Sequence, residues 1–171
     1  MAKLGVCQSA NCSQQCSPAL LRDIEELCSF GGRVQVEAAA CLNHCGQGPN
    51  VEVTRGKGEP KVVTGVKTFK DLRKLFEDSG GDVSGTRRKV SEIKFDARRL
   101  KDPEAALAKI EEAMGLLGGE EKASRKEPLL AGQLLALRSR SSAGRDAEAA
   151  ARDAEAATKL APTWAQAHVA L

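Results

Sequence analysis

Aromatic residues are scarce in this chain of 171 residues: they make up 3% of it, with one tryptophan, Trp164, and no tyrosine. The sequence therefore offers little aromatic surface on which nucleic-acid bases would stack. The formal net charge of +3 is too small by itself to indicate a nucleic-acid or membrane partner. No apolar run approaches the roughly 18 residues that a membrane-spanning helix needs.

Catalytic patterns are missing as well. The sequence shows no Ser-His-Asp set, no phosphate-binding loop and no paired-carboxylate signature. We therefore expect an electron carrier or a subunit of a complex rather than a stand-alone enzyme, and we assign no catalytic residue. The length and the 42% share of hydrophobic residues are sufficient for two modest domains.

Cysteine is confined to the first 45 residues of the chain. The six are Cys7, Cys12, Cys16, Cys28, Cys41 and Cys45. Because no secretory signal peptide precedes them, a metal site in a reducing compartment explains them better than a disulfide scaffold. The first expected strand begins so early that no targeting peptide fits before it. The alanine- and arginine-rich second half favours an organelle, the plastid stroma or the mitochondrial matrix, over the cytoplasm.

Four of these cysteines form two close pairs, Cys7 with Cys12 and Cys41 with Cys45. Thiolates in two such pairs are the usual ligands of zinc or of an iron-sulfur cluster. The segment from Gly46 to Pro49 lets the backbone approach a bulky group and then stiffens the exit from the loop. Zinc sites most often space paired ligands by two residues, whereas these pairs are spaced by four and three, which favours iron and sulfide.

The order of expected elements brings the two pairs together. Strands are predicted near residues 3–7, 34–38, 51–53 and 61–64, and helices from Ser17-Pro18 to Gly31 and from a Thr68–Asp71 capping box onward. This β-α-β-β-β-α order contains a crossover between the first two strands. Since such crossovers are right-handed and make parallel neighbours, the loops after both strands should meet at one edge of an α/β domain.

The pattern Cys7-x4-Cys12, with Ser17-x2-Leu20-Leu21 behind it and Cys41-Leu42-x2-Cys45-Gly46-x-Gly48-Pro49-x-Val51-x-Val53 further on, resembles the thioredoxin-like 2Fe-2S ferredoxins. That group includes the ferredoxin-like subunit of NADH dehydrogenases and related hydrogenases. The resemblance covers residues 3–78. It implies a thioredoxin-like domain over residues 1–79, a 2Fe-2S cluster held by Cys7, Cys12, Cys41 and Cys45, and one-electron transfer.

Three other residues near the pairs have alternative roles. Cys16 stands where that family commonly has glycine and is a candidate alternative ligand, although Cys12 already has the matching spacing. His44, with Gly46 and Gly48, is a candidate neighbour of the ligands: it can donate a hydrogen bond to sulfur or simply face water. Cys28 lies on the apolar side of the first helix and is interpreted as a small core residue.

The remaining chain changes character after residue 79. A basic linker rich in glycine and serine is predicted over residues 80–94, followed by an all-helical region over 95–171. Helices are expected at 102–117, 129–139 and 145–160, and a fourth from Pro162. Residues 131–171 resemble a tetratricopeptide repeat, with a turn at Ala143-Gly144. About two repeats are present where three are normally needed, so the array should lean on the first domain or on a partner.

Together these features predict a 2Fe-2S electron-transfer protein anchored by repeat helices in a larger respiratory or photosynthetic complex, with an electron donor or acceptor protein as partner. One alternative is a structural or assembly subunit that binds proteins through its repeats, with a cluster that is structural or lost. Another is a site with zinc or without metal. A thiol-disulfide redox site is a further alternative, although the usual Cys-x-x-Cys at a helix start is missing.

Overall fold

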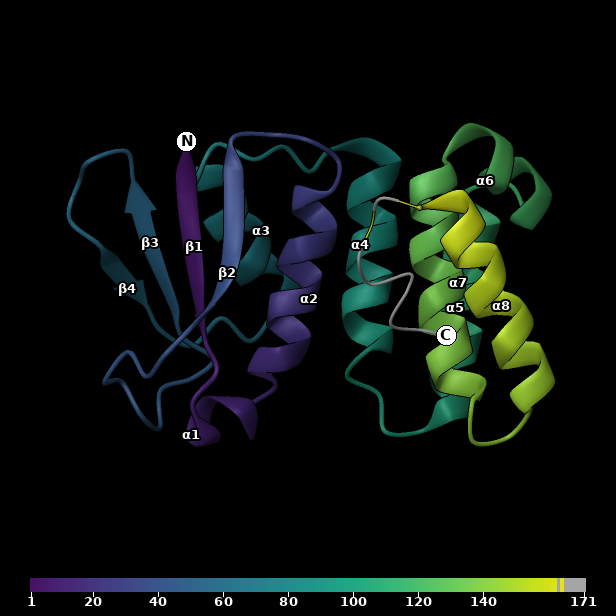
Figure 1. Cartoon of the computed structure of the whole chain (residues 1–171), viewed down its shortest axis with the longest axis horizontal. Coiled ribbons are helices and arrows are strands. Elements are labelled where there is room, and N and C mark those ends of the chain that lie inside the picture. Colours follow the sequence, from purple (N-terminus) through teal and green to yellow (C-terminus); the bar gives the residue numbers. More distant parts are fainter. Residues whose placement is uncertain (163, 165–171) are drawn as a thin grey trace. The chain divides into compact units, whose positions relative to one another are not determined.

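The computed structural model describes residues 1–162 and Trp164 (Figure 1). The chain divides into two compact units, Met1–Val83 and a second that begins at Ser84. Each unit has its own core. Within the part of the chain that is described, no helix is both long and apolar enough to cross a bilayer.

The first unit is an α/β domain with one mixed sheet. Its elements are β1 (Ala2–Cys7), α1 (Ala10–Ser13), α2 (Ser17–Cys28), β2 (Val34–Ala39), β3 (Val51–Arg55), β4 (Lys61–Val63) and α3 (Phe69–Asp78). The expected β-α-β-β-β-α order is confirmed, with the short α1 as an addition.

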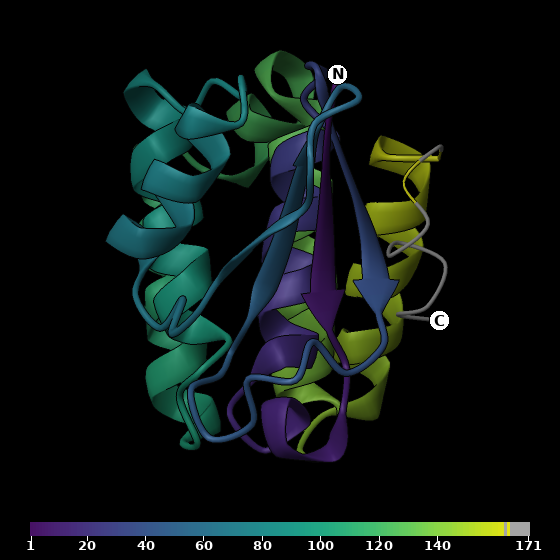
Figure 2. The ribbon, with the colours of Figure 1, turned by 90° about the vertical axis from the view of Figure 1, so that its left-hand side faces the viewer.

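The sheet has the strand order β2-β1-β3-β4. β1 and β2 are parallel, with Cys7 opposite Ala39 at their carboxyl ends. β3 runs antiparallel to β1 and forms a hairpin with β4. Figure 2 shows the arrowheads of β1 and β2 at the same end of the sheet, next to α1. The parallel pair that the crossover predicts is therefore present.

Local sequence signals account for both long helices of this unit. Pro18 lies in the first turn of α2, and the helix packs on β1 and β2. Before α3, the Thr68 hydroxyl accepts from the Asp71 N–H at 3.2 Å, and the Asp71 carboxylate accepts from the Thr68 N–H at 2.9 Å. This confirms the predicted capping box. The apolar side chains of this unit that are buried most completely are Leu4, Val6, Leu20, Ile24, Val51 and Leu72.

The second unit is helical over its described residues. It contains α4 (Gly85–Ala97), α5 (Pro103–Leu116), α6 (Glu120–Lys126), α7 (Pro128–Ser142) and α8 (Ala147–Leu160). Three of these, α5, α7 and α8, were expected within a few residues, and α6 was not. The fourth helix predicted from Pro162 falls on residues 163 and 165–171, outside the described residues.

The structure differs from the linker prediction for residues 80–94. Gly85–Ala97 is helix α4, which packs against α5 and α7, so the helical unit begins about ten residues earlier than expected. Ser84 and Gly85 open this helix instead of prolonging a loop. Val90 and Phe95 are buried, while Arg88 and Lys89 are exposed. Arg88 and Lys89 thus lie on the outer side of the helix, whereas Lys94 of the same basic run is buried. Burial of the apolar residues fixes the conformation.

Small residues bring α7 and α8 close together, as the alanine pattern indicates. A Cβ atom on Gly132 would lie 3.0 Å from the Ala161 Cβ atom and 3.3 Å from the Ala157 carbonyl oxygen. Ala150, Ala154 and Ala157 are buried along α8. The contact leaves no room for a larger side chain at residue 132.

Candidate functional site

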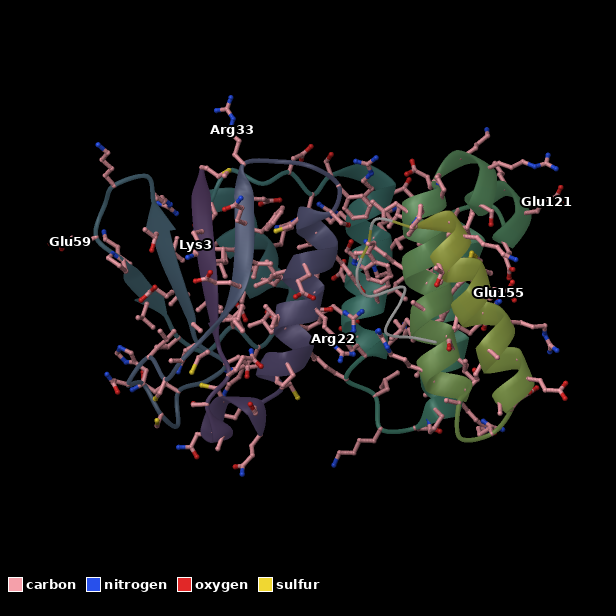
Figure 3. All side chains as sticks on the ribbon, viewed as in Figure 1. Lys3, Arg22, Arg33, Glu59, Glu121 and Glu155 are labelled. Carbon is pink, nitrogen blue, oxygen red and sulfur yellow. The ribbon has the colours of Figure 1, made fainter. Side chains whose placement is uncertain are left out.

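Both predicted cysteine pairs lie at the carboxyl ends of β1 and β2. Cys7 ends β1 and Cys12 lies in α1, whereas Cys41 and Cys45 lie in the loop after β2. The Gln8 N–H donates to the Ala39 carbonyl at 2.9 Å, which keeps the two chain exits together beyond the last strand residues. Figure 3 shows sulfur atoms in the loops at this end of the sheet. The parallel arrangement therefore brings residues more than thirty positions apart to one edge.

The first pair is buried. Cys7 and Cys12 are each 1% exposed, and α1 carries Cys12 back toward the end of β1. The Cys7 sulfur lies 3.3 Å from the Ser9 hydroxyl oxygen, and the neighbouring Cys12 thiol is one of the groups that shift the Cys7 pKa. A tight loop of four residues thus places two sulfur atoms side by side.

The thiol pKa values of this pair move in opposite directions. Burial acts to raise the pKa of Cys7, but hydrogen bonds from the Ser9 hydroxyl, the Ser9 and Leu42 backbone and Cys12 outweigh it and lower the pKa to about 7. Burial, together with the neighbouring Cys7, raises the pKa of Cys12. One thiolate is therefore readily available near neutral pH, which is the form that binds metals.

The second pair is exposed. The Cys41 and Cys45 sulfur atoms lie 3.7 Å apart, and Asn43 between them takes a positive φ of 61° to close the loop. Two sulfur atoms bound to one tetrahedral metal at about 2.3 Å each lie about 3.8 Å apart. The spacing of this pair already suits a shared metal atom.

Asn50 and Gly48 link the loops that carry the two pairs, and the Leu42 backbone of the second loop is one of the groups that lower the Cys7 pKa. Asn50 donates through Nδ2 to the Cys12 sulfur at 3.5 Å and to the His44 carbonyl oxygen at 2.8 Å. A Cβ atom on Gly48 would lie 3.0 Å from the Cys12 sulfur, so a larger residue here would push against that sulfur.

The sulfur atoms are arranged as two pairs rather than as one compact set. Over residues 1–162 and Trp164, no group of three or more His, Cys, Asp or Glu side chains is close enough to hold a single metal ion. In a 2Fe-2S cluster each iron takes two protein ligands. Two pairs of thiols match that number of protein ligands.

We compared the chain with protein-family models, with curated proteins and with solved structures. None of them matches it. The resemblances to ferredoxins and to tetratricopeptide repeats therefore rest on the residue patterns of this sequence alone.

The other residues singled out in the sequence lie as follows. Cys16 is exposed, with φ at 67°, directly before α2. Burial raises the pKa of Cys28 to about 11, with a smaller contribution from Glu25. This thiol, the last residue of α2, is half-buried rather than a core residue as expected. The His44 side chain is exposed, and its backbone carbonyl is the group that Asn50 binds. Gly46 takes a φ of 89° in the loop.

Sequence reasoning missed Asn50. It is 1% exposed and stands immediately before β3, with a cis peptide bond between Gly48 and Pro49 just ahead of it. The sequence shows only a polar residue between Pro49 and the strand, on the face opposite Val51 and Val53, which gives no sign of burial. Its partners are 6 and 38 residues away, so no local pattern reveals them.

Proposed function

We propose that the first unit is a thioredoxin-like domain that binds a 2Fe-2S cluster through Cys7, Cys12, Cys41 and Cys45 and carries single electrons between protein partners. The observation that carries the proposal is the link that Asn50 makes between the Cys12 sulfur and the His44 carbonyl, in the loops of the two thiol pairs. When bound, such a cluster accepts one electron and releases it again, with no atom transferred.

The chain's own residues would have three tasks in this role. Four thiolates would hold the group, and the buried Cys7 and Cys12 would shield one side of it from water. The exposed Cys41 and Cys45 would leave the other side at the surface, where a donor or acceptor protein can approach. Backbone and side-chain N–H groups near the sulfur atoms would set the reduction potential.

The helical unit would anchor this carrier in a larger assembly. Its neighbouring helices and small-residue contacts support a tetratricopeptide-like array. One face has a groove of about 610 Å³ whose lining includes Leu107, Arg145, Ala149 and Arg152. A groove of mixed apolar and charged character suits a protein segment as ligand.

The test is the visible absorption spectrum of anaerobically purified protein, with iron and sulfide analysis, before and after dithionite. We expect absorption that bleaches on reduction and about two irons per chain. Cys41→Ser should lower the iron content, whereas Cys16→Ser and Cys28→Ser should leave it unchanged. Loss of iron in Cys16→Ser would make that residue a ligand.

Two other results would replace the proposal. Colourless protein with about one zinc per chain would make the cysteines a structural zinc site. Metal-free protein that still assembles with partners through its helices would make it a structural or assembly subunit. Cys41→Ser separates the two roles, because it should abolish electron transfer and leave partner binding intact if our proposal is correct.

A further inference from the structure

The two cysteine loops share one buried side chain, that of Asn50. Its amide nitrogen Nδ2 carries two protons and has two acceptors, the Cys12 sulfur at 3.5 Å and the His44 carbonyl oxygen at 2.8 Å. Its own backbone carbonyl accepts from the Cys7 N–H at 3.0 Å. Asn50 therefore contacts both cysteines of the first pair and the backbone of the loop that carries the second pair.

The amide oxygen of Asn50 indicates that asparagine is not the most stabilising residue at this position. Asn50 Oδ1 is buried and has no hydrogen-bond partner among the described residues. A buried acceptor without a donor costs about 1–3 kcal/mol. A leucine of similar size would avoid that cost, so the value of asparagine here lies in its two N–H groups.

We propose that Asn50 is a positioning residue of the cluster site, which holds the Cys12 sulfur and the His44 carbonyl in place and raises the reduction potential. This inference rests on the proposed function. A hydrogen bond donated to a ligating sulfur is strengthened when that sulfur becomes more negative. Since reduction adds negative charge to the site, the donated bond stabilises the reduced state more than the oxidised state.

The first experiment is a redox titration of the full chain and of Asn50→Leu. The leucine removes both donated bonds without adding charge. We expect its equilibrium constant for reduction to fall about tenfold, which is 59 mV for one electron. Asn11→Leu is the matched control: it carries the same substitution one residue from Cys12, on an exposed side chain, and should keep the wild-type potential.

A second variant covers the case in which leucine prevents folding. Asn50→Asp keeps the shape of the side chain, loses the donated bonds and adds a negative charge, so its potential should fall further. Asn43→Asp adds the same charge at an exposed position of the second loop and measures the effect of charge alone. The reduction potential should fall more in Asn50→Asp than in Asn43→Asp. Folding of each variant is verified by circular dichroism.

The possible results distinguish the role of Asn50 from cluster binding itself. Wild-type protein that binds no iron overturns both. Iron-loaded protein whose two Asn50 variants retain the wild-type potential and iron content overturns the inference alone. A folded Asn50→Leu with reduced iron content, beside a fully loaded Asn11→Leu, supports the positioning role, because only the contact between the loops differs.

Discussion

Replacing Arg138 by methionine removes the charge that joins several helices of the second unit. Its guanidinium group, on α7, makes two hydrogen bonds of 2.7 Å each to the Asp153 carboxylate on α8. It also contacts Glu111 at 3.0 Å and Glu120 at 2.9 Å. Hydrogen bonding to Asp153 is the main reason that the pKa of Arg138 is raised further above its already high value, so the group stays charged.

The expected loss of stability follows from how deeply each ion pair of Arg138 is buried. The Arg138 and Asp153 side chains are 19% and 14% exposed, whereas Glu111 and Glu120 are 60% and 50% exposed. Exposed pairs contribute about 0–1 kcal/mol, and breaking a buried pair costs about 3–5 kcal/mol. The Asp153 pair lies between these cases, so we expect Arg138→Met to lower the free energy of unfolding by about 2 kcal/mol.

The assay is urea denaturation of the full chain, followed by tryptophan fluorescence. Trp164 is the only tryptophan, is 7% exposed and belongs to the second unit, so the signal reports on that unit. A double-mutant cycle with Asp153→Asn isolates the coupling between the two side chains. The matched control is Arg125→Met, which breaks a pair with Glu121 of the same 2.7 Å length.

The control pair is 77% and 81% exposed and should contribute only about 0.5 kcal/mol. A coupling between Arg138 and Asp153 no larger than that of the control would refute the reasoning. Partial burial would then not be what makes this ion pair strong.

Three further substitutions test the packing of the helical unit and one helix cap. Gly132→Leu should lower the stability of the helical unit by about 1–3 kcal/mol, because it overpacks the contact between α7 and α8. The control Gly115→Ala lies on an open surface of α5 and should raise the stability by up to about 1 kcal/mol. Equal effects of the two substitutions on stability would contradict the close contact at Gly132. Thr68→Ala should destabilise α3 by about 1 kcal/mol, measured as faster amide exchange over residues 69–78. The pKa of Asp71 is lowered, chiefly by the Thr68 hydroxyl, so this capping contribution is complete above the ordinary value of 3.8 and is lost as the pH falls through the lower folded value. The difference between Thr68→Ala and wild type should therefore shrink in acid, and a difference that stays constant would remove Asp71 from the cap.

Local chemistry was sufficient to predict several elements. The Thr68–Asp71 box and the proline in the first turn of α2 act over two to four residues, and both lie where the sequence places them; α5 also begins within one residue of the predicted start at residue 102. The meeting of the cysteine loops was also predictable, because the hand of a β-α-β crossover is nearly invariant.

Helix α4 was not predictable in the same way. Its sequence is rich in basic residues, and its conformation depends on packing against α5 and α7. Lys94 is 2% exposed on α4 and donates to Gln133, 39 residues further along the chain. A lysine in a basic run gives no sign of such a partner.

The sequence by itself determined which cysteines pair and which edge of the sheet they occupy, because spacing and crossover hand are properties of short segments. Only the tertiary structure decided that Asn50 joins the two pairs, that Arg138 holds three acidic residues 15, 18 and 27 positions away, and that α4 belongs to the helical unit. The physical reason is range. Caps and turns are satisfied within one helical turn, whereas a buried amide or guanidinium group takes its partners from whichever segments the folded chain places beside it.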